Sequence, residues 1–238
     1  MVGHLTTIDI GGEKFSWVEV TAEDLIGRPL KGYEAKYGGL KLYVVGKLPL
    51  PIPKPRVAVV GTRRPSNRGI ELTEAVVEEL VREGVTVVSG LARGIDTVAH
   101  KTAIEKGGKT VAVLGTPVDI FYPPENRELQ LRLMRDHMVV SQFPLGWPVT
   151  RRNFPMRNKT MALLSDATVI VEAGERSGVI HQAWECVRLG RPLFIHRALR
   201  RITWVKRLLE WGAILFEDVG ILRGWGVYIF PRVLSRKD

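Results

Sequence analysis

The chain has 238 residues, 45% of them hydrophobic, which is enough to bury a full core in one domain and excludes a mainly disordered protein. Lysine and arginine number 35 and aspartate and glutamate 25, so the net charge is +10. This excess favours a polyanionic partner, a nucleic acid or a phosphorylated ligand, over a basic surface without any ligand.

The N-terminal part of the chain alternates in polarity, as strands do. The stretch IDIGGEKFSWVEV alternates around a Gly-Gly turn and predicts a hairpin, and GLKLYVVGKL predicts another strand. The proline-rich stretch LPLPIPKP that follows cannot form the interior of a helix and is typical of a linker. We therefore expect a small β-rich segment with its linker over residues 1–50.

Beyond the linker, strand-length apolar runs alternate with stretches of helical periodicity. One helix is predicted over residues 70–84, where apolar residues recur at helical spacing and Gly84 suits a C-terminal stop. The predicted strands cover residues 57–61, 86–90, 110–115, 138–143, 167–173, 192–196 and 213–218. Strands that are apolar on both faces and alternate with helices imply a doubly wound, mostly parallel α/β sheet of the extended Rossmann-like type. We place this core at residues 51–222 and a C-terminal tail at 223–238.

Glycine, hydroxyl and guanidinium groups follow the predicted strands. Because ligands of such sheets bind outside the carboxyl ends of the strands, we expect these groups to share one crevice. Glycines admit the backbone close to a phosphate, helix N-termini carry partial positive charge, and arginine forks grip phosphate oxygens. Arginines from several strand ends exceed what one mononucleotide needs and suit a string of phosphates. The candidate nucleic-acid-binding residues are Gly61, Thr62, Arg63, Arg64, Ser89, Gly90, Arg93, Arg151, Arg152, Phe154, Arg157, Asn158, Lys159, Ser177 and Gly178.

Two aromatic residues, Trp147 and Phe154, lie among these basic residues. Aromatic rings interleaved with cations hold single-stranded nucleic acid by base stacking, at about 1–3 kcal/mol per base. We expect stacking for Phe154, whereas packing under a loop is the favoured interpretation for Trp147.

Other polar residues are expected to be structural. Asp96 and His100 lie four residues apart on a predicted helix, and we expect Asp96 to cap the helix and His100 to pack beside it. Glu172 follows a strand near several arginines and is expected to form an ion pair. Backbone bracing and DNA contact both stay open for Arg157 and Asn158. No catalytic residue, metal site or cofactor is predicted.

The sequence lacks the features of a secreted or membrane protein. Its first residues have neither the basic start nor the apolar stretch of a signal peptide, and no later apolar run approaches the roughly 18 residues of a membrane span. The single cysteine, Cys186, cannot form an internal disulfide and is expected to be a buried thiol. These features indicate a cytoplasmic protein.

Five sequence blocks resemble, in order, the DNA-processing protein A family (DprA/Smf). They are VAVVGTRRPSNRG, SGLARGIDTVAH, YPPEN, NFPMRNKTMALLSD and VIVEAGERSG. Five ordered blocks are far more specific than a single glycine motif. The resemblance implies a Rossmann-like core, binding of single-stranded DNA, assistance to a RecA-type recombinase, and a homodimer.

The resemblance also implies site residues, and the chain departs from the family pattern in places. The residues that it places in the DNA pocket are Arg63, Arg151 or Arg152, Phe154 and Arg157. Lys159 replaces a second arginine, which keeps the charge and loses the fork. The stretches SGVIHQA and FIHRALR also differ from the family, so the far wall of the pocket is expected to differ. The family's usual winged-helix C-terminal domain is not matched, so we expect the core without it.

The leading interpretation is a non-enzymatic protein that protects single-stranded DNA and assists recombinase loading in DNA uptake, recombination or repair. One alternative is a phosphoribohydrolase-like enzyme, with Glu172 and Glu175 as candidate carboxylates, although EAGERSGVIHQA lacks the Pro-Gly-Gly-x-Gly-Thr signature of such enzymes. Another alternative is a sensor of small nucleotides on the same fold. The amphipathic stretch WVKRLLEWGAILF fits either a core helix or a subunit seam.

Overall fold

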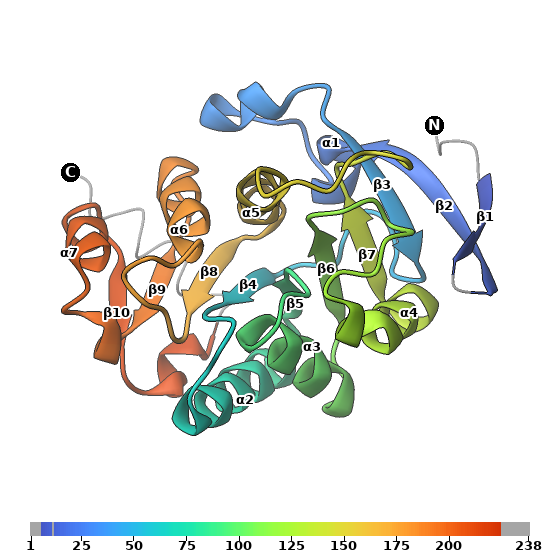
Figure 1. The fold of residues 1–238 in the computed structure, drawn as a ribbon. Helices are drawn as coiled ribbons and strands as arrows, with labels where there is room; N and C mark the ends of the chain where they lie inside the picture. The colour runs from blue at the N-terminus through green and yellow to red at the C-terminus, as the bar shows by residue number, and fades with distance from the viewer. Residues whose placement is uncertain (1–5, 11, 225–238) are drawn as a thin grey trace.

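A computed structural model describes residues 6–10 and 12–224. Its centre is a ten-stranded sheet in the order β1-β2-β3-β7-β6-β5-β4-β8-β9-β10, with helices on both faces (Figure 1). The strands are β1 (Thr6–Ile10), β2 (Glu13–Thr21), β3 (Lys41–Gly46), β4 (Arg56–Val60), β5 (Thr86–Ser89), β6 (Thr110–Leu114), β7 (Met138–Ser141), β8 (Ala167–Ile170), β9 (Leu193–His196) and β10 (Ile214–Phe216). The α-helices are α1 (Ala22–Ile26), α2 (Asn67–Arg82), α3 (Ile95–Glu105), α4 (Arg127–Asp136), α5 (Asn153–Leu164), α6 (Val179–Arg188) and α7 (Thr203–Glu210). Short 3₁₀ helices occupy Gly32–Tyr37, Pro124–Asn126, Arg197–Leu199 and Val219–Leu222.

The seven strands β4 to β10 are all paired in parallel, which confirms the predicted doubly wound α/β fold. Both faces of these strands are covered, and alternate residues of β4 serve opposite faces. Val57 and Val59 pack in the core under α2 and α3, whereas Ala58 and Val60 pack in the core under α5 and α6. The predicted helix before Gly84 is α2, and Gly84 follows it with a φ of +73°.

The winding of the sheet reverses beside β4. The chain runs outward from β4 through β5, β6 and β7, and then returns to place β8, β9 and β10 on the other side of β4. The switch point therefore lies between β4 and β8, and ligands of such folds bind outside the carboxyl ends of the two strands that flank it.

The N-terminal segment contains the predicted hairpin, and its strands extend the central sheet. β1 and β2 pair antiparallel, β2 pairs with β3, and β3 joins the parallel strands through β7. Sequence reasoning missed α1, whose N-cap Thr21 and third residue Asp24 form a capping box, and Gly27 ends the helix in the left-handed region. The domain boundary near residue 50 stays a prediction, because β3 belongs to the same sheet as the core.

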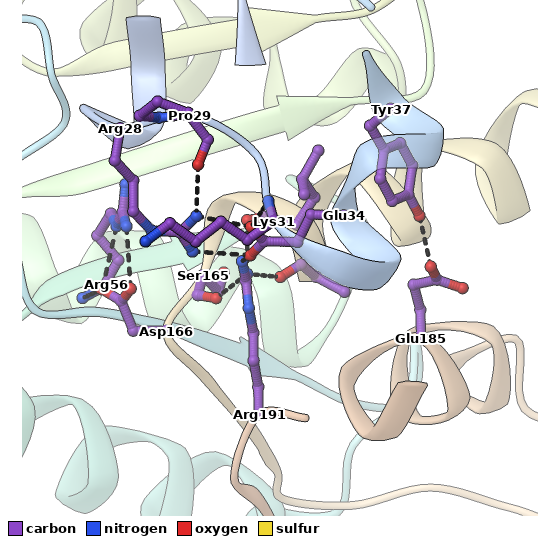
Figure 2. Close-up of polar contacts among 12 residues, drawn as sticks. Arg28, Pro29, Lys31, Glu34, Tyr37, Arg56, Ser165, Asp166, Glu185 and Arg191 are labelled. Carbon is purple, nitrogen blue, oxygen red and sulfur yellow. Dashed lines mark hydrogen bonds and ion pairs between the residues drawn. The ribbon is translucent and has the colours of Figure 1, made fainter. Parts of the chain in front are cut away.

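A cluster of ion pairs joins this N-terminal segment to the core, and we call it the Glu34 cluster (Figure 2). Both carboxylate oxygens of Glu34 accept hydrogen bonds from Arg28, at 2.6 and 2.8 Å, and Arg191 Nη2 donates to Glu34 Oε1 at 2.8 Å. The Arg28 hydrogen bond is the largest cause that lowers the pKa of Glu34 to about 2, against the opposing effect of burial. Beside it, Tyr37 and Lys36 bind the buried carboxylate of Glu185.

Two arginines near the Glu34 cluster, Arg191 and Arg56, also bind backbone carbonyl oxygens and a carboxylate of the core. Arg191 Nη1 donates to the carbonyl oxygens of Ala162, Leu163 and Ser165. Arg56, which is 1% exposed, forms an ion pair with Asp166 at 2.9 Å. Through Glu34, Arg191 therefore ties the end of α5 to the N-terminal segment, and Arg56 ties the residues after α5 to β4.

The remaining features of the core agree with the sequence pattern. Cys186 is a free, buried thiol as expected, and burial raises its pKa to about 11. Trp204 and Leu208 of α7 pack in the core, whereas Trp211 is 61% exposed. Across residues 6–10 and 12–224, no helix is both long and apolar enough to cross a membrane. Most of the predicted tail, residues 225–238, lies outside the described residues.

Candidate functional site

A cleft of about 490 Å³ opens at the switch point of the sheet. Its walls are the loops after β4 and β8, with the first turns of α3, α5 and α6 around it. The lining residues are Val60, Gly61, Thr62, Arg63, Ala92, Asp96, Phe154, Pro155, Arg157, Asn158, Met161, Gly174, Arg176, Ser177, Gly178, Val179, His181 and Gln182. Because three helix N-termini meet here, the partial positive charge at the start of each helix favours an anionic ligand.

The loop after β4 brings Arg63 to the mouth of the cleft. Gly61 is required at the turn, because a Cβ there would lie 2.5 Å from Ile95 Cγ1 and 2.8 Å from the carbonyl oxygen of Glu172. The backbone N–H of Thr62 donates to that same carbonyl oxygen at 2.7 Å, which ties the loop to the end of β8. Arg63 is exposed, and its guanidinium carbon lies 5.5 Å from the centre of the Phe154 ring. The structure thus pairs a cation with an aromatic ring at the rim.

Arg157 and Asp96 form the buried floor of the cleft. Arg157 is 4% exposed and its Nη1 donates to the carbonyl oxygens of Gly90 and Val113. Burial lowers the pKa of Arg157 and raises the pKa of Asp96, and each charge opposes the effect of burial on the other. Gly90 cannot be replaced freely, because a Cβ there would lie 1.9 Å from Arg157 Nη1. Arg157 therefore braces the loop after β5, one of the two roles that the sequence left open for it.

The first turn of α5 presents Phe154 to the cleft. Asn153, the first residue of α5, is buried, and its Nδ2 donates to the carbonyl oxygen of Pro148 at 3.1 Å, which fixes the loop before the helix. The Phe154 ring also contacts Tyr122, with ring centres 5.2 Å apart. Gly115 lies beneath Phe154, since a Cβ at Gly115 would be 2.7 Å from the ring. Phe154 is partly exposed, so it is held in place without being covered.

The loop after β8 forms the far wall and begins α6. Asn158 Nδ2 donates to the carbonyl oxygen of Gly178 at 3.1 Å, and the Ser177 hydroxyl accepts from the N–H of Val179 at 3.3 Å. Trp204 Nε1 donates to the carbonyl oxygen of Gly174 at 3.2 Å, which attaches this loop to α7. Asn158 thus braces the far wall from the side of α5.

The structure does not bring every predicted site residue into the cleft. Ser89 is fully buried and donates to the carbonyl oxygen of Val59, because it ends a central strand, so it cannot contact a ligand. Gly90 lies under the floor, where it accepts from Arg157. Five further candidates are exposed but do not line the cleft: Arg64, Arg93, Arg151, Arg152 and Lys159. Trp147, expected under a loop, packs its ring against Phe143 and is 46% exposed.

The predicted partners of two carboxylates, Glu172 and Asp96, are wrong. Glu172 forms no ion pair within the described part of the chain; its carboxylate instead accepts from the N–H and hydroxyl of Ser66, at 2.9 to 3.3 Å, at the start of α2. Asp96 does not cap α3, because its Oδ2 accepts from Ala92 N in the loop before the helix. His100 is fully buried, and its Nδ1 lies 2.7 Å from Thr110 Oγ1.

Several lining residues were missed by sequence reasoning. Arg176 belongs to the same GERSG loop as Ser177 and Gly178, so the strand-end rule would have found it. His181 and Gln182 lie on the first turn of α6, and no local pattern marks them as lining residues. Within residues 6–10 and 12–224, no group of three or more histidine, cysteine, aspartate or glutamate side chains can hold a metal ion.

The fold and the cleft define a class of protein: a doubly wound α/β protein with a glycine-lined, cationic and aromatic cleft at its switch point. A family model described as "DNA recombination-mediator protein A" matches residues 29–218. The chain belongs to this family, as the five sequence blocks implied.

Individual relatives agree with this assignment. The DNA processing protein DprA of Streptococcus pneumoniae is 41% identical over 153 residues, which is 64% of this chain and 54% of that protein. Its X-ray structure aligns with a TM-score of 0.71 at 30% identity, over 87% of this chain and 74% of the other. A structure of DNA processing protein A from Helicobacter pylori, which concerns its single-stranded DNA binding mode, aligns with a TM-score of 0.68 at 24% identity, over 98% of this chain and 97% of that one. The chain spans about a third to about half the length of the curated relatives it matches.

Proposed function

We propose that this protein binds single-stranded DNA in the cleft between the loops after β4 and β8, as part of DNA recombination. The observation that carries the proposal is the exposed Arg63 guanidinium over the partly exposed Phe154 ring, at the mouth of a cleft that three helix N-termini surround. Cations grip the phosphates and an aromatic ring stacks a base, which is how proteins hold single strands without reading sequence. The family description as a recombination mediator supports the same substrate.

The same proposal covers what the bound strand is for. The protein protects single-stranded DNA, passes it to a RecA-type recombinase, and acts in the cytoplasm as a homodimer during DNA uptake, recombination or repair. It has no catalytic role of its own and needs no cofactor. The name DNA processing protein in the relatives is consistent with a DNA substrate.

The enzymatic alternative is not favoured, because both candidate carboxylates have structural partners. Glu172 accepts hydrogen bonds from Ser66 at the start of α2, and Glu175 accepts from the N–H of Thr203 at 3.0 Å at the start of α7. Neither residue lines the cleft. Asp96 does line it, but this residue is only 6% exposed and lies beside Arg157, so it belongs to the floor.

The proposal is tested by titrating labelled single-stranded and double-stranded DNA at two ionic strengths. Single strands are expected to bind more tightly, with log affinity falling by about 0.7 per phosphate contact for each unit of log salt. Arg63→Ala is expected to raise the Kd while leaving the melting temperature nearly unchanged, because the side chain is exposed. Arg135→Ala, at an exposed arginine that pairs with Glu13 near the amino end of β7, is the matched control. Equal Kd values for native protein and Arg63→Ala would contradict the proposal, and rapid release of free base from AMP would favour the enzyme instead.

A further inference from the structure

A second group of exposed side chains lies next to the cleft, on the loops after β5 and β6. Tyr122 is 42% exposed, although one side of its ring contacts Phe154 at 5.2 Å between ring centres. Arg93 is exposed and forms an ion pair with Glu125, a residue that is itself exposed. None of these three side chains lines the cleft.

The loop that carries Tyr122 is braced by hydrogen bonds. Gln130 Nε2 donates to the carbonyl oxygen of Val118 at 2.9 Å, and the Thr116 hydroxyl donates to the carbonyl oxygen of Ile120 at 3.2 Å. Within this fixed loop, Ile120 and Tyr122 are 39% and 42% exposed. Burial of such side chains is favourable. The hydrogen-bonded loop thus holds an exposed aromatic ring beside Phe154, where a ligand in the cleft can reach it.

The buried Asn126 also holds the Tyr122 loop and the Arg93 loop together. Asn126 Nδ2 donates to the carbonyl oxygen of Leu91 at 2.9 Å and to Thr97 Oγ1 at 2.8 Å. Arg93 is held on this loop by its ion pair with Glu125, which lies three residues after Tyr122 in the chain. The ring, the cation and its carboxylate are thus one preformed group.

We propose that Tyr122 and Arg93 form a second nucleotide subsite, in which the base next to the one held at Phe154 stacks on Tyr122 while Arg93 exchanges Glu125 for the adjoining phosphate. This inference rests on the proposed function and extends it. The chemistry is that of single-strand binding, an aromatic face for a base and a guanidinium for a phosphate. In the free protein Glu125 forms an ion pair with Arg93, so it competes with the phosphate and lowers the affinity of the subsite.

The test is a titration of labelled oligo-dT of increasing length with native protein and four variants. Tyr122→Ala is expected to raise the Kd roughly fivefold or more for the longer oligonucleotides, the loss of one stacked base, and to leave the shortest ones unaffected. Tyr122→Phe is expected to bind as the native protein does, since stacking needs the ring and not the hydroxyl. Arg93→Gln is expected to reduce the salt slope by about 0.7, the loss of one phosphate contact.

The fourth variant is expected to bind DNA more tightly than the native protein, and a folding defect would not increase the affinity. Glu125→Gln is expected to lower the Kd by up to about fivefold, because an exposed ion pair no longer competes with the phosphate. Glu13→Gln, which breaks the exposed pair with Arg135, is the matched control and is expected to change nothing. If Tyr122→Ala and Arg93→Gln bind every length as the native protein does, and Glu125→Gln binds no tighter, the second subsite is excluded. When the subsite variants show no effect, Arg63→Ala separates the two proposals. If Arg63→Ala weakens binding, the proposed cleft stands and only the second subsite fails. If Arg63→Ala does not weaken binding, both proposals fail.

Discussion

Arg63 and Arg176 in the cleft differ from Arg191 and Arg28 in the Glu34 cluster, although all four are arginines of the same chain. The cleft pair is exposed and forms no ion pair within the described residues, whereas Arg191 is 9% exposed and shares Glu34 with Arg28 (Figure 2). Burying a charge is costly unless it is paired, and the arginines of the Glu34 cluster are paired with carboxylates and carbonyl oxygens. Exposed cations without an ion-pair partner keep their hydrogen-bonding capacity for a ligand. The comparison therefore separates arginines that hold the fold from arginines that await a phosphate.

The largest expected effect comes from breaking the Glu34 cluster. Arg191→Ala leaves the carboxylate of Glu34 with one partner fewer and removes donors from three backbone carbonyls, so we expect a loss of about 3–5 kcal/mol in the free energy of unfolding. The Kd of the folded protein for single-stranded DNA is expected to stay unchanged. Urea unfolding and a DNA titration measure the two quantities. Arg176→Ala, at an exposed arginine of the cleft, is the control and is expected to leave the free energy of unfolding within about 0.5 kcal/mol of native. A loss below about 1 kcal/mol for Arg191→Ala would remove the distinction between the two regions.

The second effect is the pH dependence of the Glu34 cluster. The pKa of Glu34 is lowered from 4.5 to about 2 in the folded protein, so its stabilisation is fully present above pH 4.5 and is lost as the pH falls through about 2. A shift of this size corresponds to about 3 kcal/mol. Comparing urea unfolding of native protein and Glu34→Gln between pH 7 and pH 2 is expected to show the stability difference shrinking over that window. A difference that stays constant with pH would mean that Glu34 titrates normally in the fold.

The smallest expected effect distinguishes two aromatic residues, Phe154 in the lining of the cleft and Trp147 outside that lining. Phe154→Ala is expected to weaken single-strand binding by about 1–3 kcal/mol, the value of one stacked base, because the ring lines the cleft beneath Arg63. Trp147→Ala is expected to change the Kd little, because Trp147 packs against Phe143 outside the cleft. Fluorescence anisotropy with one oligonucleotide compares both. If Trp147→Ala loses more affinity for the oligonucleotide than Phe154→Ala does, the DNA follows the loop before α5 and not the cleft.

Sequence reasoning located the cleft because the strand-end rule depends on topology alone. Arg63, Phe154 and Ser177 come from segments far apart in the chain, and all three line the cleft as expected. The rule fails for Ser89, because a residue at the last position of a central strand is buried by its neighbours on both sides. It also fails for Glu172, because the rule places a carboxylate near the crevice without naming its partner. The nearest partner turned out to be the hydroxyl and N–H at the start of α2.

The Glu34 cluster was not predicted at all, and the reason is distance along the chain. Glu34 meets Arg191 across 157 positions, and Tyr37 meets Glu185 across 148. No local spacing connects such residues, and a charged residue in an N-terminal loop gives no sign that it will be buried. The cluster exists because the N-terminal strands extend the sheet and carry their loops over α5 and α6.

The amino-acid sequence by itself determined the parallel sheet, its strand ends and the loops that carry glycine and arginine. Hydrophobic periodicity, apolar runs and turn residues specify these features, because each depends only on residues close together in the chain. The tertiary structure alone decided which cations are paired, which lie exposed at the cleft, and how the N-terminal segment attaches. Those outcomes depend on burial and on partners from distant parts of the chain, and desolvation is set by the packed whole rather than by any one segment.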